Sequence, residues 1–100
     1  MIVSFRQAGG FAGLIRGCEL DTSTMPAGEA DALRGLVQQS EVERAGSTAQ
    51  SRGRDVEVYE IVIRSGDREH RVRFDEMTLP EGLEPLIDFL RARARPAPPR

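Results

Sequence analysis

One cysteine and one histidine, Cys18 and His70, are the residues of this chain best suited to nucleophilic chemistry. A thiolate becomes a catalytic nucleophile when an imidazole base lies within hydrogen-bond reach. Cys18, however, falls in an alternating apolar and polar pattern in which a small buried residue is expected, and His70 occupies an apolar-facing position of a strand-like run. We therefore expect both residues to support the fold, with a nucleophilic pair as the alternative.

The chain lacks the residues that other catalytic chemistry or a metal site would need. A zinc site takes three or four His, Cys or carboxylate ligands at fixed spacings, and the chain offers one His and one Cys. Carboxylates do occur close together, as Asp75-Glu76 and as Glu41 with Glu43, but they fall at a turn and in a polar stretch, where solvated charge is the usual role. The sequence thus predicts a protein that is not an enzyme and holds neither a metal nor a cofactor.

The stretch best suited to binding is a glycine-rich tip, Gly9-Gly10-Phe11-Ala12-Gly13, between two strand-like runs. Glycine is favoured where φ must be positive or where another backbone comes close, so a hairpin tip is expected here. The tip leads into a strand and not into a helix, which excludes the arrangement of a phosphate-binding loop. Phe11 has two interpretations: it folds over an edge of the core, or it stays exposed as an anchor for a partner.

The first half of the chain predicts two strands and a helix. Alternating residues indicate that Ile2 to Gln7 and Leu14 to Leu20 form an antiparallel hairpin. Capping side chains before Pro26 then predict a helix from Pro26 to about Gln39. From Ser40 to Asp55 the chain is polar and shows no periodicity, so we expect the longest loop here, and a mobile one. The apolar stripe of the helix consists of Ala30, Leu33, Leu36 and Val37.

The second half predicts the same elements in the same order. Val56 to Arg64 is the strongest strand signal, and Glu69 to Asp75 follows it after a short turn, with His70, Val72 and Phe74 facing inward. Because Pro85 lacks a backbone donor, we expect regular helix from about Glu84 to Arg93, after an irregular turn over Pro80 to Leu83. Its apolar stripe consists of Leu83, Leu86, Ile87 and Leu90.

These elements predict a two-layer α+β domain in ββα-ββα order, with a four-stranded antiparallel sheet and two helices on one face. Residues 1–95 form the domain, and residues 96–100, rich in proline, are expected to be a disordered tail. The halves also match in sequence at a spacing of 54 residues, which indicates either an internal duplication or two independently capped helices. The matching segments are Leu20-Asp21 with Phe74-Asp75, and Thr24-Met25-Pro26 with Thr78-Leu79-Pro80.

Charge and apolar content limit the partners and the compartment. Residues 1 to 90 carry 10 arginines against 16 acids, a net charge of −6, while the last ten residues carry four arginines. An acidic body argues against a nucleic-acid groove. No apolar run is long enough to cross a bilayer, no leader-like start is present, and a single cysteine agrees with a reducing compartment. We therefore expect a cytoplasmic protein that is a monomer when free.

The tip and the segments after it resemble the emfourin family. The most specific part is Phe5-Arg6-x-x-Gly9-Gly10-Phe11-Ala12-Gly13, followed by Arg16. More generic similarity continues to residue 93 and covers most of the chain. Its parts are Leu20-Asp21, Leu33 to Val37, Val72-Arg73-Phe74 and Leu86-Ile87-Asp88-Phe89-Leu90-Arg91.

The resemblance implies a small bacterial inhibitor that lies across the active-site cleft of a protealysin-like or thermolysin-like zinc metallopeptidase. On physical grounds the Gly-rich tip, with Gly9, Gly10, Ala12 and Gly13, would bring its backbone close to the cleft, and Phe11 would fill an apolar pocket. Arg6 and Arg16 would contact carboxylates of the enzyme. The alternative is a regulatory interaction module, for example an antitoxin-like protein, and a steep salt dependence of binding would distinguish nucleic-acid contact from pocket binding.

Overall fold

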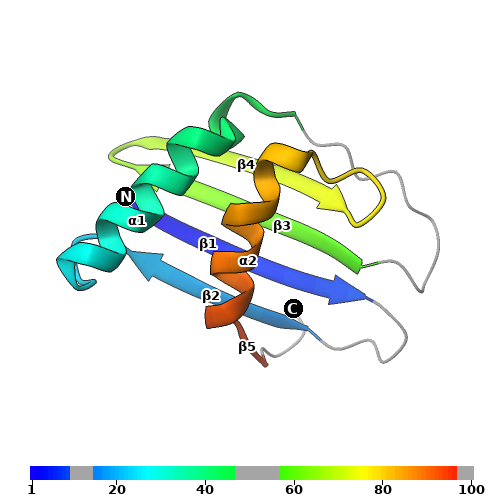
Figure 1. The fold of residues 1–100 in the computed structure, drawn as a ribbon, viewed down its shortest axis with the longest axis horizontal. Helices are drawn as coiled ribbons and strands as arrows, with labels where there is room; N and C mark the ends of the chain where they lie inside the picture. The colour runs from blue at the N-terminus through cyan, green and yellow to red at the C-terminus, as the bar shows by residue number, and fades with distance from the viewer. Residues whose placement is uncertain (10–14, 47–56, 97–100) are drawn as a thin grey trace.

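The computed structural model describes residues 1–9, 15–46 and 57–96, and it shows a sheet with two helices on one face (Figure 1). All strand pairs are antiparallel, and the strands follow the order β4-β3-β1-β2-β5. The predicted two-layer α+β fold is confirmed. The prediction of a four-stranded sheet was wrong, because a fifth strand follows the second helix and extends the predicted ββα-ββα order to ββα-ββαβ. The strands are β1 (Ile2–Gly9), β2 (Arg16–Asp21), β3 (Glu57–Ser65), β4 (Arg68–Asp75) and β5 (Arg95–Pro96).

The additional strand, β5, is short and forms at the edge of the sheet. It pairs Arg95 with Gly17 and Pro96 with Arg16 of β2. A proline lacks a backbone N–H, so sheets accept it at an edge, where the missing donor faces no further strand. Pro96, expected in a disordered tail, therefore belongs to the sheet, and residues 97–100 of that tail lie outside the described residues.

Both helices lie within a residue or so of their predicted bounds. α1 (Ala27–Ser40) follows β2, and α2 (Glu84–Arg93) follows β4. Pro85 lies in the first turn of α2, where a helix has no partner for a backbone N–H and therefore tolerates proline. The 3₁₀ turn η2 (Glu81–Leu83) precedes α2 in the place of the predicted irregular turn.

The core fills the space between the sheet and the two helices. Of the three β4 residues predicted to face inward, Val72 and Phe74 are buried there and His70 is half-buried. Three residues of the α1 stripe are buried as well, whereas Leu36 is only half-buried. Val62 is also buried, at 8% exposure, although strand alternation places it on the opposite, open face of the sheet. The core residues are Val3, Phe5, Leu33, Val37, Val42, Tyr59, Ile61, Ile63, Val72, Phe74, Leu83, Leu86, Ile87 and Leu90.

The predicted loop from Ser40 to Asp55 begins later than the sequence indicates. Its first residues end α1 and form the 3₁₀ turn η1 (Val42–Arg44), in which Val42 is fully buried. Glu41 has a φ of 54°, the left-handed conformation that often ends a helix, and this turns the chain from α1 into η1. The carbonyl oxygen of Ala45 then lies 3.1 Å from Nε2 of His70. Residues 47–56 of the predicted loop lie outside the described residues.

The segments that match at a spacing of 54 residues form two similar turns. In the first turn, the Asp21 carboxylate accepts a hydrogen bond from the backbone N–H of Ser23 at 2.9 Å. In the second turn, the Asp75 carboxylate accepts a hydrogen bond from the backbone N–H of Met77 at 2.8 Å. The carbonyl of each Asp also accepts the N–H three residues further on, at 3.0 and 3.1 Å. The similarity in sequence is therefore a similarity in structure as well.

Candidate partner-binding end of the sheet

The antiparallel register brings distant segments of the chain together at one end of the sheet. Gly9, at the end of β1, pairs with Glu57 at the start of β3, and β4 ends on the same side at Asp75. β2 begins there with Arg16, beside β5. We call this the tip end, formed by Gly9, Arg16, Glu57 and Asp75. The opposite end, formed by Ile2, Asp21 and Ser65–Arg68, we call the far end (Figure 1).

The predicted contact residues are described in part. Arg6, Gly9 and Arg16 are described, whereas Gly10, Phe11, Ala12 and Gly13 lie outside the described residues. Gly9 has a φ of 98°, a conformation that residues with a side chain rarely adopt. Glycine is therefore required where β1 ends and the predicted tip begins.

Arg6 and Arg16 flank the predicted tip but lie on opposite faces of the sheet. Directly opposed residues of neighbouring strands share a face, and Arg16 opposes Gln7 whereas Arg6 opposes Gly17. Arg6 is half-buried on the open face, and Arg16 is exposed on the face that carries the helices. The two guanidinium groups are thus not brought together, and a partner that contacts both must extend around this end of the sheet.

Gly17 allows β1 and β2 to approach closely beneath Arg6. A Cβ atom at this position would lie 2.5 Å from the carbonyl oxygen of Phe5, a separation that real contacts do not show, and 3.6 Å from Cγ of Arg6. Any side chain here would push the strands apart. The glycine therefore sets the local spacing of the two strands that lead to the tip.

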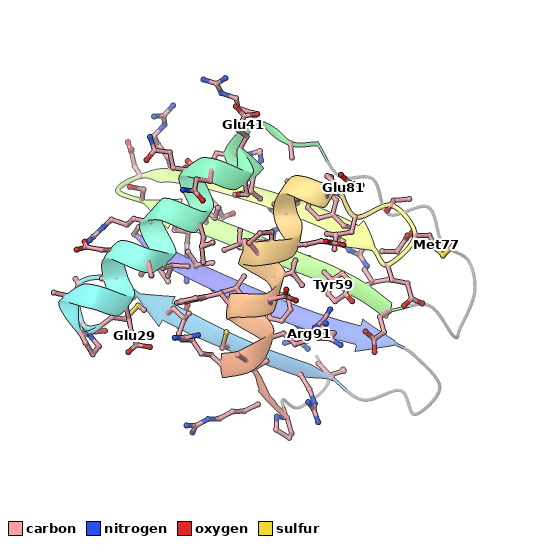
Figure 2. The ribbon with its side chains drawn as sticks, in the orientation of Figure 1. Glu29, Glu41, Tyr59, Met77, Glu81 and Arg91 are labelled. Atoms are coloured by element: carbon pink, nitrogen blue, oxygen red, sulfur yellow. The ribbon has the colours of Figure 1, made fainter. Side chains whose placement is uncertain are left out.

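A hydrogen-bonded network lies next to the tip end. Glu57 Oε2 accepts one hydrogen bond from Gln7 Nε2 at 2.8 Å and one from the Tyr59 hydroxyl at 3.3 Å. Arg91 of α2 donates to the Tyr59 hydroxyl oxygen at 2.8 Å, and its guanidinium lies 5.4 Å from the centroid of the ring (Figure 2). The network thus joins β1, β3 and α2.

The surroundings of the tyrosine in this network, burial foremost, favour its neutral form. Burial raises the pKa of the Tyr59 hydroxyl above its ordinary value of 10.0, the Arg91 charge lowers it, and the Glu57 carboxylate raises it again. Tyr59 is therefore a proton donor at neutral pH. Among the described residues, no group donates a hydrogen bond to the buried Oε1 of Gln7, which leaves an unpaired acceptor beside the tip end.

The structure separates Cys18 from His70. Cys18 lies on β2 and His70 on β4, and two whole strands, β1 and β3, lie between them. The Cys18 thiol instead donates to the carbonyl of Leu90 at 3.6 Å, and burial raises its pKa despite the nearby Arg93 charge. The two residues therefore form no nucleophilic pair. Within the described ranges, no group of three or more His, Cys, Asp or Glu side chains could hold a metal ion.

The open face of the sheet carries charges that are paired with one another. Arg64 forms an ion pair with Glu19, and Arg71 lies 3.4 Å from Glu60. Exposed pairs of this kind contribute little to stability, about 0 to 1 kcal/mol each, but they leave few unsatisfied charges for a ligand. Away from the tip end, the open face is thus better explained as a solvated surface than as a site.

Met77 is a candidate contact residue that the sequence analysis did not select. It lies in the turn after β4, at the tip end, and its side chain is 80% exposed (Figure 2). Among the described residues it is the only large hydrophobic side chain with such exposure. The signal was present in the sequence, because the spacing of 54 residues that aligns the two turns puts Met77 opposite the polar Ser23.

A family model described as Emfourin matches residues 5–91 of the chain. This chain belongs to the Emfourin family. The match begins in β1 and ends in α2, so that it includes the tip end and both turns of the emfourin fold. The comparison with curated proteins and the comparison with solved structures each found no match.

Membership of the Emfourin family supports a role as a protease inhibitor with a metallopeptidase as the general class of partner. An inhibitor family is also consistent with a protein that is not an enzyme. Among the residues that the structure describes, no helix is long and apolar enough to span a membrane.

Proposed function

We propose that this emfourin inhibits a thermolysin-like zinc metallopeptidase, of the protealysin type, by placing its tip end across the active-site cleft. The family match over residues 5–91 is the observation that carries the proposal. The tip sequence, from Gly9 to Gly13, is the part of that range whose composition suits a cleft best, because glycines let a backbone approach closely.

The proposed contact combines an aromatic anchor with two cations. Phe11 fills an apolar pocket near the zinc ion, while Gly9, Gly10, Ala12 and Gly13 run along the cleft. Arg6 and Arg16 approach carboxylates of the peptidase from opposite faces of the sheet, which fits a cleft that encloses the tip from two sides. Such an arrangement excludes substrate without any chemistry on the part of the inhibitor.

The Phe11→Ala variant tests this proposal. If Phe11 is the anchor, the inhibition constant against a thermolysin-like peptidase should rise by about thirtyfold, or about 2 kcal/mol, while the melting temperature stays unchanged. If Phe11 belongs to the core, stability should fall first, and inhibition should fall only with the unfolded fraction. Measuring thermal unfolding and inhibition on the same preparation separates the two cases.

A matched control comes from the other hairpin. Asp67 lies in the exposed turn between β3 and β4, at the far end of the sheet. Asp67→Ala should leave inhibition unchanged, because the proposed contact does not extend there. Equal losses for the two variants would count against a contact at the tip end, and undiminished inhibition by a stable Phe11→Ala protein would remove Phe11 from the mechanism.

A further inference from the structure

The turn from Asp75 to Thr78 presents one apolar side chain to solvent on a fixed backbone. The Asp75 carboxylate is 1% exposed and accepts hydrogen bonds from the N–H groups of Met77 and Thr78, both at 2.8 Å. The Thr78 hydroxyl in turn accepts the N–H of Asp75 at 3.1 Å. A buried carboxylate with short hydrogen bonds holds the turn in one conformation. The backbone of Met77 is thus ordered before any partner arrives.

The similar turn that follows Asp21 shows that this kind of turn does not require a methionine at the position of Met77. In the turn at the far end, the corresponding position is Ser23, which is exposed and polar. Two residues later, both turns place an apolar side chain, Met25 or Leu79, against the core. Packing therefore explains Met25 and Leu79 but not Met77, whose side chain is 80% exposed.

The two turns differ in their position relative to the tip. The turn of Ser23 lies at the far end, beside Ile2, whereas the turn of Met77 lies at the tip end. The N–H of Glu76 donates to the carbonyl of Glu57 at 3.1 Å, and Glu57 is the strand partner of Gly9. β4 and β1 are two strand spacings apart, roughly 10 Å. A partner that covers ~800 Å² of this protein is wide enough to contact both segments.

We infer that Met77 is a second anchor for the peptidase and binds in an apolar pocket of its surface beside the cleft. The inference rests on the proposed function and adds to it a contact on β4. An unbranched thioether side chain adapts to pockets of irregular shape, and the fixed backbone limits the ordering cost to that side chain. The turn at the far end carries serine, and the turn at the tip end carries methionine.

Exchange of the two turn residues tests the inference. The variants are Met77→Ser, Met77→Leu and Ser23→Met, together with the double exchange, and each keeps the Asp residue that orders its turn. Inhibition constants are measured against purified thermolysin and a protealysin-like peptidase with a small peptide substrate, and thermal unfolding is measured in parallel. Met77→Ser should weaken inhibition about tenfold or more without a change in melting temperature. Met77→Leu should retain most of the inhibition of the wild type, because leucine keeps an apolar side chain at this position. Ser23→Met should have no effect, either alone or in the double exchange.

The outcomes separate this inference from the proposed function. If the wild-type chain inhibited neither thermolysin nor a protealysin-like peptidase, the proposed function would be overturned, and the inference with it. Inhibition by the wild type that Met77→Ser leaves unchanged would overturn the inference alone. Restoration of inhibition by Ser23→Met in the double exchange would also overturn it, since the gain would then depend on added hydrophobicity and not on position.

Discussion

At the scale of single residues, Tyr59 connects the tip end to the helical layer. Its ring stacks on Phe5 in the core, with the ring centroids 6.2 Å apart, while its hydroxyl joins Glu57 to Arg91. A buried tyrosine needs a partner for its hydroxyl, and here the partners come from β3 and α2. The network therefore holds the Glu57 carboxylate in place, next to the strand partner Gly9.

The pKa of Tyr59 reports the effect of the charged groups around its hydroxyl. Tyr59 is the only tyrosine in the chain, so ultraviolet absorbance reports its ionisation alone. We expect a pKa above the ordinary 10.0. Arg91→Gln should raise the pKa further because it removes a nearby positive charge, and Glu57→Gln should lower it because it removes a negative one. A pKa that fell in Arg91→Gln would contradict the network.

The same shift predicts how stability depends on pH. Because folding raises the pKa of Tyr59, the neutral hydroxyl contributes its full stability below the unfolded value of about 10. That contribution is lost as the pH rises through the folded pKa. Tyr59→Phe should therefore flatten the fall in melting temperature above pH 10, and an unaltered fall would mean that other groups cause it.

At the scale of elements, both β4 and α2 supply fully buried residues to the core. Phe74 and Leu90 are both fully buried, one from each layer. Phe74→Ala and Leu90→Ala should each lower the free energy of unfolding by about 2 to 5 kcal/mol, because they remove apolar contacts and leave a cavity. Exposed neighbours on the same elements provide controls: Glu69→Ala and Asp88→Ala should stay within about 0.5 kcal/mol of the wild type in urea unfolding.

Local patterns predicted most elements, and contacts between distant segments explain the failures. Alternation identified β3 and β4 because one face of each is buried. β5 could not be predicted, since Arg95 and Pro96 show no strand pattern and pair only because α2 ends beside β2. Val42 lies in a polar stretch, and only the left-handed Glu41 turns it into the core.

The candidate site was predicted less completely than the fold. The sequence predicted glycines where φ is positive, and the positive φ of Gly9 at the end of β1 agrees with this prediction. The separation of Arg6 and Arg16 onto opposite faces depends on the register of β1 with β2, which composition does not determine. Two of the four arginines in the last ten residues, Arg91 and Arg93, belong to α2 and contact other side chains.

At the scale of the whole molecule, two ββα halves share one core. They meet where β1 pairs with β3 and where α1 faces α2. Arg93 of α2 contributes to the second contact, because its guanidinium lies 2.7 Å from the carboxylate of Glu29 on α1. The same guanidinium lies 3.6 Å from the centroid of the Phe89 ring of its own helix. Neither half alone buries its apolar residues, because the core cluster contains residues of both halves.

Separation of the halves should abolish the fold. A peptide of residues 1–46 retains one hairpin and one helix but lacks the core residues that β3, β4 and α2 supply. A two-stranded sheet with a half-covered helix is marginal in water. Circular dichroism should therefore show no cooperative thermal transition for this peptide, and a sharp transition would show that the first half is an independent domain.

The positions of Met1 and Pro96 determine how this protein is best attached to a surface or a tag. The amino group of Met1 lies 3.2 Å from the Thr22 hydroxyl, at the far end of the sheet. β5, by contrast, ends beside Arg16, at the tip end. A tether on residue 1 directs the tip end towards the solution, whereas a tether beyond Pro96 emerges next to the surface that we propose a peptidase covers. Immobilisation through the amino terminus therefore leaves that surface accessible.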